Sequence, residues 1–373
     1  GERRVHGYWR SFPGSMVRMK CLNLWALPPS VLALPEAERL KLIKEKYTVV
    51  SDEGGFAQAS QNSQAPLSTA DSVLALTFLS VVMGGPVVLM ASGFACIIFG
   101  SWVHCVYWLT TALALATHPL PDVAAPLARS RLSLALYRYF SYRWLWSGDD
   151  GEHGEAVAPF VGCGPPHGVL PLANVLSIPA INACTSASFV GVAASVVFFT
   201  PFLRYLTLFG CVSASAGDIT KALSSGACAG IVPDGIAGIF RLAQHPTEEV
   251  VYLRARKGLA KLALRTGRPI MPVYSMGNTR AFSAAFDPFG LMERLSRAAQ
   301  AAIFVYWGRC YLPVPYRTPI TMCFGRPIEV TRTPHPSDAE VDALHERLQR
   351  EIVETFERHK AVVGWGNIKL RLE

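Results

Sequence analysis

Three patterns of hydrophobic and polar positions follow one another along the 373-residue chain. Residues 1–70 mix apolar and charged positions, with helical spacing over 35–47 and a polar, linker-like stretch over 51–71. Residues 71–121 are apolar almost throughout. Over 122–373, short apolar runs alternate with stretches of helical period. The pattern predicts a partly disordered N-terminal region, a hydrophobic segment and a folded domain, in that order.

The hydrophobic segment carries no Asp, Glu, Lys or Arg between Asp71 and Asp122. About 20 apolar residues in a helix cross a bilayer, so the segment has room for two helices, and Gly93 and Gly100 suit their close packing. Basic residues on both flanks favour a hairpin whose two ends face the cytosol. They are Lys41, Lys44 and Lys46 before the segment and Arg129, Arg131, Arg138 and Arg143 after it. A helix pair that enters only one leaflet stays open, because Gly84-Gly85-Pro86 offers a turn partway along.

Strand-like apolar runs alternate with helical stretches in the third part of the chain. The expected strands cover 158–163, 227–233, 269–275 and 319–325, and the expected helices cover 218–226, 256–267 and 337–360. Ser337 and Glu340 form a capping box in front of the longest helix, and Asp218 is the expected N-cap of the shortest. A charge-free run over 169–203 fits either a buried helix or a membrane-embedded one. This alternation is typical of an α/β domain.

The composition indicates a membrane-associated protein with an anionic partner. Charged residues make up 17% of the chain, against about 25% in ordinary soluble domains. The net charge is +8 and the isoelectric point about 9.1, which suits nucleic acid, anionic lipid or a polyanionic substrate. Nucleic acid is the weakest of these, because the sequence has neither a basic run with interleaved aromatics nor zinc-finger spacing.

A single histidine, His167, follows the first expected strand in the stretch Gly164-Pro165-Pro166-His167-Gly168. The prolines restrict the backbone, and Gly168 permits close approach of another chain segment or a ligand. Histidine changes charge near neutral pH and often serves as a general base. A buried histidine with a structural role is the alternative for His167.

Two further stretches carry chemistry. Val232-Pro233-Asp234-Gly235 ends the second expected strand, where backbone N–H groups can face a developing oxyanion and Asp234 can orient a histidine. A tight turn capped by Asp234 is the alternative. Arg256 and Lys257 lie at the start of an expected helix, where positive charge opposes the helix dipole. A bound phosphate explains that placement, and a solvated basic face is its alternative.

Taken together, these stretches resemble the type 2 diacylglycerol acyltransferase family, which includes monoacylglycerol acyltransferases and wax synthases. The resemblance begins near 136–144 and continues to the C-terminus. It is carried by Pro165-Pro166-His167-Gly168 against His-Pro-His-Gly, by Arg256-Lys257-Gly258-Leu259 with Met271–Gly277, by Phe324-Gly325-Arg326-Pro327-Ile328, and by His359-Lys360 with Gly364.

The chain departs from the family pattern at four positions. Pro165 replaces the first histidine of His-Pro-His-Gly. Gly238 and Asn278 stand where the family usually has glutamate. Glycerolipid acyltransferases more broadly have an Asp five positions after the catalytic histidine, where this chain has Leu172. These departures bear on the acceptor alcohol more than on the type of reaction.

The resemblance implies a membrane-anchored, acyltransferase-like α/β domain preceded by a hydrophobic helical hairpin. In the implied mechanism, His167 takes the proton of an acceptor hydroxyl that attacks a fatty acyl-CoA, and Asp234 orients His167. The implied substrate-binding residues are Pro166, Gly168, Gly235, Arg256, Lys257 and Gly258, of which Arg256 and Lys257 bind the phosphates of CoA. No metal or bound cofactor is implied, and acyl-CoA is a co-substrate.

The resemblance favours an acyl-CoA:diacylglycerol acyltransferase that makes triacylglycerol. Its expected location is the endoplasmic reticulum membrane, with the catalytic domain facing the cytosol, and lipid droplets as a further location. The alternatives are the same chemistry on monoacylglycerol, a long-chain alcohol or phytol, or a non-catalytic membrane protein that kept the fold. Membrane lipids are expected partners and nucleic acid is not. The oligomeric state stays open, homo-oligomers included.

Overall fold

The computed structural model describes residues 19–51, 64–147, 159–242 and 247–373, and its centre is a nine-stranded mixed sheet. The strand order is β2 (Thr48–Ser51), β1 (Met19–Asn23), β3 (Arg143–Ser147), β12 (Thr321–Phe324), β9 (Ile270–Met276), β4 (Val161–Cys163), β7 (Cys228–Ile231), β5 (Phe189–Ala193) and β6 (Cys211–Ser213). The five strands from β9 to β6 run parallel, and the pairs β1–β2, β1–β3 and β9–β12 are antiparallel. The four strands expected from the sequence all belong to this sheet, and residue 158 of the first lies outside the described residues.

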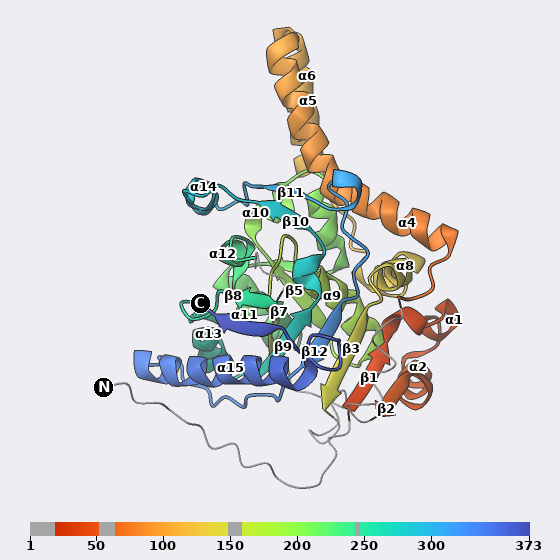
Figure 1. Ribbon diagram of the computed structural model, residues 1–373, viewed down its shortest axis with the longest axis vertical. Coiled ribbons are helices and arrows are strands. Elements are labelled where there is room, and N and C mark those ends of the chain that lie inside the picture. Colours follow the sequence, from red (N-terminus) through yellow and green to blue (C-terminus); the bar gives the residue numbers. More distant parts are fainter. Residues whose placement is uncertain (1–18, 52–63, 148–158, 243–246) are drawn as a thin grey trace.

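Helices cover both faces of the sheet, as Figure 1 shows. On one face lie α8 (Arg131–Tyr139) and α9 (Leu172–Cys184); on the other lie α11 (Ala216–Ser224), α13 (Gly258–Thr266) and α15 (Asp338–His359). The central strand β9 has every residue buried and sends alternate side chains to the two layers. Met271 and Val273 join the α8–α9 core, whereas Ile270 and Tyr274 join the α11–α13–α15 core. The chain therefore has the layered α/β architecture that the sequence predicts.

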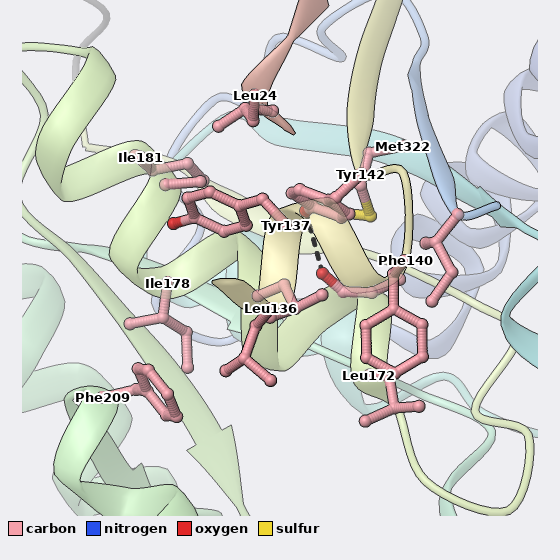
Figure 2. Packing of buried hydrophobic residues seen from close by; sticks show 14 of the residues in the cluster. Leu24, Leu136, Tyr137, Phe140, Tyr142, Leu172, Ile178, Ile181, Phe209 and Met322 are labelled. Atoms are coloured by element: carbon pink, nitrogen blue, oxygen red, sulfur yellow. Dashed lines mark hydrogen bonds between the residues drawn. The ribbon is translucent and has the colours of Figure 1, made fainter. Parts of the chain in front are cut away.

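The α8–α9 core is rich in aromatic side chains (Figure 2). The rings of Tyr137 and Tyr142 stack with centroids 5.6 Å apart, and Ile178 and Ile181 of α9 belong to the same cluster. Most of α9 is buried inside the domain, so the first part of the charge-free run 169–203 is a buried helix. Tyr142 Oη donates a hydrogen bond to the carbonyl of Ala173 in α9 at 3.0 Å. This bond holds α9 against the segment that joins α8 to β3.

Shorter elements complete the domain. The remaining helices are α1 (Pro29–Leu32), α2 (Glu36–Leu42), α7 (Ala124–Ala128), α10 (Ser195–Phe199), α12 (Gly235–Ile239) and α14 (Leu291–Ala299), with short 3-10 or π turns at Leu24–Ala26, Ile43–Tyr47, Leu203–Phe209, Asn278–Arg280 and Arg309–Tyr311. Two small sheets pair β10 (Ser283–Ala285) with β11 (Val305–Trp307), and β8 (Glu248–Val251) with β13 (Lys369–Leu372).

The N-terminal part of the chain adds strands to the central sheet. Strands β1 and β2 pair with each other and β1 pairs with β3, so residues 19–51 pack with the α/β domain. The partial disorder expected of 1–70 and the linker expected over 51–71 fall mainly on residues outside the described ones.

Capping details agree with the sequence in part. The capping box of Ser337 and Glu340 is present at the start of α15. Helix α11 begins earlier than expected: its N-cap is Ser215, whose hydroxyl accepts from the backbone N–H of Asp218, so the assignment of Asp218 as N-cap is wrong. The reason is that a serine three residues upstream already satisfies that N–H. Helix α13 begins at Gly258 rather than at Arg256.

The hydrophobic segment forms a long helix that turns back on itself. Helix α4 (Thr69–Leu79), a π turn (Ser80–Gly84) and α5 (Gly85–Phe99) are continuous, and α6 (Trp102–Thr117) packs along α5. Figure 1 shows α5 and α6 projecting together from the α/β body. The chain reverses at Gly100, which is extended, and not at Gly84-Gly85-Pro86. Pro86 lies inside this continuous helix, directly after the π turn, and it cannot donate a helical hydrogen bond there.

Close contact of α5 with α6 depends on a small residue. A side chain at Gly93 would lie 2.7 Å from the ring of Trp108, whose Nε1 donates to the carbonyl of Leu89 at 3.0 Å. Within the described residues, the 31-residue helix Thr69–Phe99 is the one long and apolar enough to cross a membrane, and α6 has 16 residues. The first part of the 31-residue helix, α4, packs on α8, where the buried Asp71 pairs with Arg138 at 2.8 Å.

Candidate active site

His167 and Asp234 follow two adjacent parallel strands. Strand β4 leads into the loop that carries His167, and β7 leads into the turn that carries Asp234. Adjacent parallel strands end at the same edge of a sheet, which is where α/β proteins place their ligands. The two residues that the sequence singles out separately therefore meet in space.

The contact between them runs through the backbone of His167. The N–H of His167 donates to Asp234 Oδ2 at 2.8 Å. The imidazole turns elsewhere: its Nδ1 lies 2.9 Å from the carbonyl oxygen of Gly168. A carbonyl only accepts, so Nδ1 carries a proton, and in the neutral imidazole Nε2 then holds the lone pair. Asp234 thus orients the loop, whereas the carbonyl of Gly168 orients the ring, which differs from a direct carboxylate–imidazole pair.

Asp234 is fully buried. Burial raises the pKa of its carboxyl group, and the electrostatic contributions of His167 and Arg256 and the hydrogen bond from the backbone N–H of His167 act in the opposite direction. Its Oδ1 has no hydrogen-bond partner among the described residues. One oxygen is therefore engaged with the loop and the other remains available for a donor.

Gly238 provides the space that Asp234 occupies. A side chain at Gly238, one helical turn further along α12, would lie 2.3 Å from Asp234 Oδ2. Gly235 has φ +46°, and a side chain there would meet open space. The turn into α12 thus combines a tightly packed carboxylate with an uncrowded backbone beside it.

A third residue, Asn278, holds the His167 loop in place. It follows β9, the other strand next to β4, and is buried. Its Nδ2 lies within hydrogen-bond reach of the carbonyls of Pro166 at 3.1 Å, His167 at 2.8 Å and Leu170 at 3.3 Å. Its Oδ1 accepts from the backbone N–H of Ala173 at 3.0 Å. One amide side chain therefore ties both ends of the loop to the start of α9.

Sequence reasoning noted Asn278 only as a departure from a family pattern and missed this role. A signal is present: an amide placed directly after the glycine that ends a central strand. Gly277 has φ +89°, and a side chain there would collide with the carbonyl of Pro319. Gly168 is similarly constrained, with φ +63° and a side chain at 2.9 Å from Asn278 Nδ2. The loop and its clamp leave no room for larger residues at either glycine.

The two basic residues expected to bind phosphate face different surroundings. Arg256 lies close enough to Asp234 to affect its pKa, stacks over the ring of Tyr252 at 5.3 Å, and has an Nε without a partner in the described part of the chain. Lys257 instead forms an ion pair with Asp342 of α15 at 2.5 Å. Lys257 and Gly258 line a pocket of about 320 Å³ together with Asp338 and Asp342. Carboxylates in that pocket disfavour a phosphate, so Arg256 is the better placed cation.

A buried acid, which sequence reasoning also missed, lies behind the clamp. Glu249 accepts a hydrogen bond from Thr279 Oγ1 at 2.7 Å and lies 3.4 Å from the hydroxyl of Tyr274. Burial raises the pKa of Glu249 to about 7, against the opposing effects of Thr279, Arg280 and Tyr274. Thr279 is the neighbour of Asn278, so the charge of Glu249 is coupled to the segment that holds the His167 loop.

The arrangement suits proton transfer at Nε2 of His167. The imidazole is partly exposed, its tautomer is set, and its backbone is fixed by Asp234 and Asn278. Within residues 19–51, 64–147, 159–242 and 247–373, no group of three or more His, Cys, Asp or Glu side chains is arranged to hold a metal ion.

Comparison with known proteins places this site inside a recognised segment. Residues 152–372 match the family model described as diacylglycerol acyltransferase. The chain is 30% identical over 174 residues to 2-acylglycerol O-acyltransferase 1 of Bos taurus, covering 44% of this chain and 52% of that protein. It is 29% identical over 219 residues to diacylglycerol O-acyltransferase 2 of Homo sapiens, covering 53% and 56%. The chain spans about half the length of these curated relatives.

A solved structure is also similar at low level. The crystal structure of the 1-acyl-sn-glycerophosphate acyltransferase from Thermotoga maritima aligns with a TM-score of 0.35 and 15% identity, covering 76% of this chain and 97% of that one.

Proposed function

Since the chain belongs to the diacylglycerol acyltransferase family, we propose that it transfers a fatty acyl group from acyl-CoA to the free hydroxyl of diacylglycerol. The observation that carries this proposal is the state of His167. Its Nδ1 is committed to the carbonyl of Gly168, and its backbone is anchored on Asp234. A general base needs an unprotonated nitrogen in a fixed position, and Nε2 of a neutral His167 is the proposed one.

In the proposed reaction, Nε2 takes the proton of the acceptor hydroxyl while its oxygen attacks the thioester carbonyl. A new C–O bond forms and the carbonyl oxygen becomes an oxyanion. When this intermediate collapses, the C–S bond breaks and the departing sulfur of CoA receives the proton from His167. Backbone N–H groups near Gly168 and Gly235 are the proposed donors to the oxyanion. Arg256 is the proposed contact for the phosphates of CoA.

The hairpin of α5 and α6 is the proposed membrane anchor. At 1.5 Å per residue, the 15-residue α5 is about 22 Å long, which is shorter than a hydrocarbon core of about 30 Å. The π turn Ser80–Gly84 belongs to the body, where Val82 and Met83 are buried. Helix α4 is held against α8 by the pairing of Asp71 with Arg138, so neither segment adds to this reach. We therefore favour a hairpin that enters one leaflet and returns.

A hairpin of this kind has both ends on one side of the membrane. We propose that this side is the cytosolic face of the endoplasmic reticulum, which the basic residues on both flanks favour. It also fits a lipid droplet, whose surface is a single lipid layer. Diacylglycerol and the fatty acyl chain would then reach the site from the same lipid layer that holds the hairpin.

The proposal is tested with membranes that contain the expressed chain. Labelled oleoyl-CoA is supplied with diacylglycerol, monoacylglycerol or a fatty alcohol, and the wild type is compared with His167→Ala. The matched control is His335→Ala, which changes an exposed histidine. Labelled triacylglycerol that is lost only in His167→Ala supports the reaction, the acceptor and the base together.

The other outcomes are equally informative. Product from monoacylglycerol or a fatty alcohol alone replaces the proposed acceptor. Product that persists in His167→Ala removes the proposed base. No product from any acceptor in a folded, membrane-bound wild type contradicts the proposed activity and favours a non-catalytic role.

A further inference from the structure

Helix α14 has its amphipathic faces reversed. Its apolar residues Leu291 and Leu295 are 57% and 50% exposed, and Phe289 just before it is 86% exposed. Two of its polar residues point inward: Ser296 is fully buried and Glu293 is mostly covered. A helix on a protein surface normally buries its apolar stripe, so this orientation needs a partner that covers the apolar side.

The reversed orientation is fixed by specific bonds. Glu293 pairs with Arg241 at 2.8 Å and with Arg297 at 2.7 Å. The hydroxyl of Ser296 accepts from the backbone N–H of Ile303 at 2.8 Å. Asp287 caps the helix by accepting from two of its first N–H groups, each at 2.7 Å. Rotating α14 to bury its leucines would break the contacts to Arg241, Ile303 and Asp287 and would keep only the pair of Glu293 with Arg297, which lies within the helix.

The apolar surface extends from α14 toward the root of the hairpin. We call it the apolar collar; its members are Phe289, Leu291, Leu295, Ile303, Val305, Tyr311 and Leu312, each at least 48% exposed. The collar is tied to the hairpin directly. Tyr306 of β11 donates from its hydroxyl to the carbonyl of Met83 at 3.0 Å, and Pro313 lies beside Gly84. Figure 1 shows α14, β10 and β11 at the end of the body from which α5 and α6 project.

We propose that the apolar collar lies in the interfacial layer of the membrane that the hairpin enters, as a second lipid contact. The inference rests on the proposed membrane insertion of the hairpin and deepens it. An interfacial helix has an apolar face toward the acyl chains and basic residues near the headgroups, and Arg294 and Arg309 are exposed within this segment. The exposed ring of Tyr311 suits the same layer, where aromatic side chains gather.

A second contact with the membrane would fix the orientation of the body relative to the lipid surface, which one contact does not. A hairpin alone leaves the hairpin and the body free to tilt together relative to the lipid surface. A second contact, beside the root, sets the orientation of the body relative to the lipid surface. The collar thus determines how the α/β domain faces its lipid substrate.

The test places a photo-crosslinker at single positions of the full-length chain in vesicles of phosphatidylcholine and phosphatidylserine. Leu295→p-benzoylphenylalanine probes the collar, and Phe94→p-benzoylphenylalanine probes the hairpin, where Phe94 is 64% exposed. The matched control is Ala343→p-benzoylphenylalanine on α15, an exposed position at the opposite end of the body. Each substitution is made at an exposed position, so the fold is expected to be retained, and lipid adducts are measured by mass spectrometry.

We expect lipid adducts at positions 295 and 94 and no lipid adducts at position 343. Adducts at 94 without adducts at 295 overturn the collar and leave the hairpin standing. Adducts at neither position contradict membrane insertion itself and remove the basis of both proposals. A crosslink from position 295 to a second copy of the chain shows that the collar is a dimer interface and also overturns the inference.

Discussion

The side-chain amide of Asn278 donates to the backbone carbonyl of His167 at 2.8 Å, across 111 positions of the sequence. The same amide reaches two neighbouring carbonyls of the loop and accepts a hydrogen bond at the start of α9. Asn278 thus acts on His167 as a positioning residue, through the loop backbone and without contacting the imidazole.

Replacing Asn278 with Asp keeps the shape and removes every donor. A buried carboxylate would then face three carbonyl oxygens, so the loop is expected to shift. A misplacement of about 1 Å lowers a rate by roughly 100-fold, and we expect a fall of about that size in kcat for Asn278→Asp. Steady-state acyl transfer and the melting temperature are both measured.

The matched control is Asn182→Asp on α9. Asn182 also donates to two carbonyls, those of Ile178 and Phe189, but it lies outside the loop. Its variant is expected to lose stability while keeping kcat. If both variants lose kcat in proportion to their loss of stability, Asn278 has only a structural role.

Asp234 is predicted to matter as an acceptor for the N–H of His167 more than as a charge. Asp234→Asn retains an oxygen that can accept this hydrogen bond, whereas Asp234→Ala leaves the N–H unsatisfied, which costs about 1–3 kcal/mol. We expect Asp234→Asn to keep clearly more activity than Asp234→Ala. Equal losses in kcat for the two variants would instead point to the negative charge as the essential property.

Gly238→Ala is predicted to act through Asp234. The added methyl group would lie 2.3 Å from Asp234 Oδ2, so the carboxylate must move away from the loop. Activity is expected to fall about as far as in Asp234→Ala, and the double variant should show little further loss because both changes remove one interaction. Gly366→Ala, where the added group meets open space, is the control, and fully additive losses would exclude the coupling.

We predict that the free energy of unfolding decreases between about pH 4.5 and pH 7 because of Glu249. Burial raises its pKa from 4.5 to about 7, so in this range the folded protein holds a proton that the unfolded chain has released. Stability is therefore fully present below pH 4.5 and is lost as the pH rises through 7, by roughly 3 kcal/mol at 1.36 kcal/mol per pKa unit. Glu249→Gln should flatten this part of the profile in denaturant titrations. An unchanged pH profile in the variant would assign the slope to other groups.

Short-range patterns in the sequence predicted the elements of the fold well. Strand β9 reads as an apolar run because both of its faces are buried, and α15 carries its own start signal in Ser337 and Glu340. The position at which the hairpin turns is not predicted correctly from the sequence. Gly84-Gly85-Pro86 has the composition of a turn, yet Gly85 is needed for contact with Phe202, where a side chain would lie 2.4 Å from the ring.

The site was predictable only in its parts. His167 and Asp234 stand at strand ends, which local pattern reveals, and their meeting follows from the pairing of β4 with β7. The partner atoms did not follow, because whether a carboxylate meets a ring or an N–H depends on loop geometry. The local signal at Asn278, an amide directly after Gly277, does not identify its partners, since all of them lie more than 100 positions away.

The continuous helix from α4 through the π turn into α5 joins the hairpin to the body without a flexible link. The ion pair of Asp71 with Arg138 fixes the first part of this helix, α4, to α8. The hairpin and the α/β domain therefore move as one rigid unit. A domain joined to its membrane segment by a flexible linker can reach a neighbouring membrane. A domain joined by a rigid helix cannot. With the hairpin in a membrane, as proposed, the chain would search for its proposed lipid substrate by lateral diffusion in two dimensions, and would consume only what its own membrane contains.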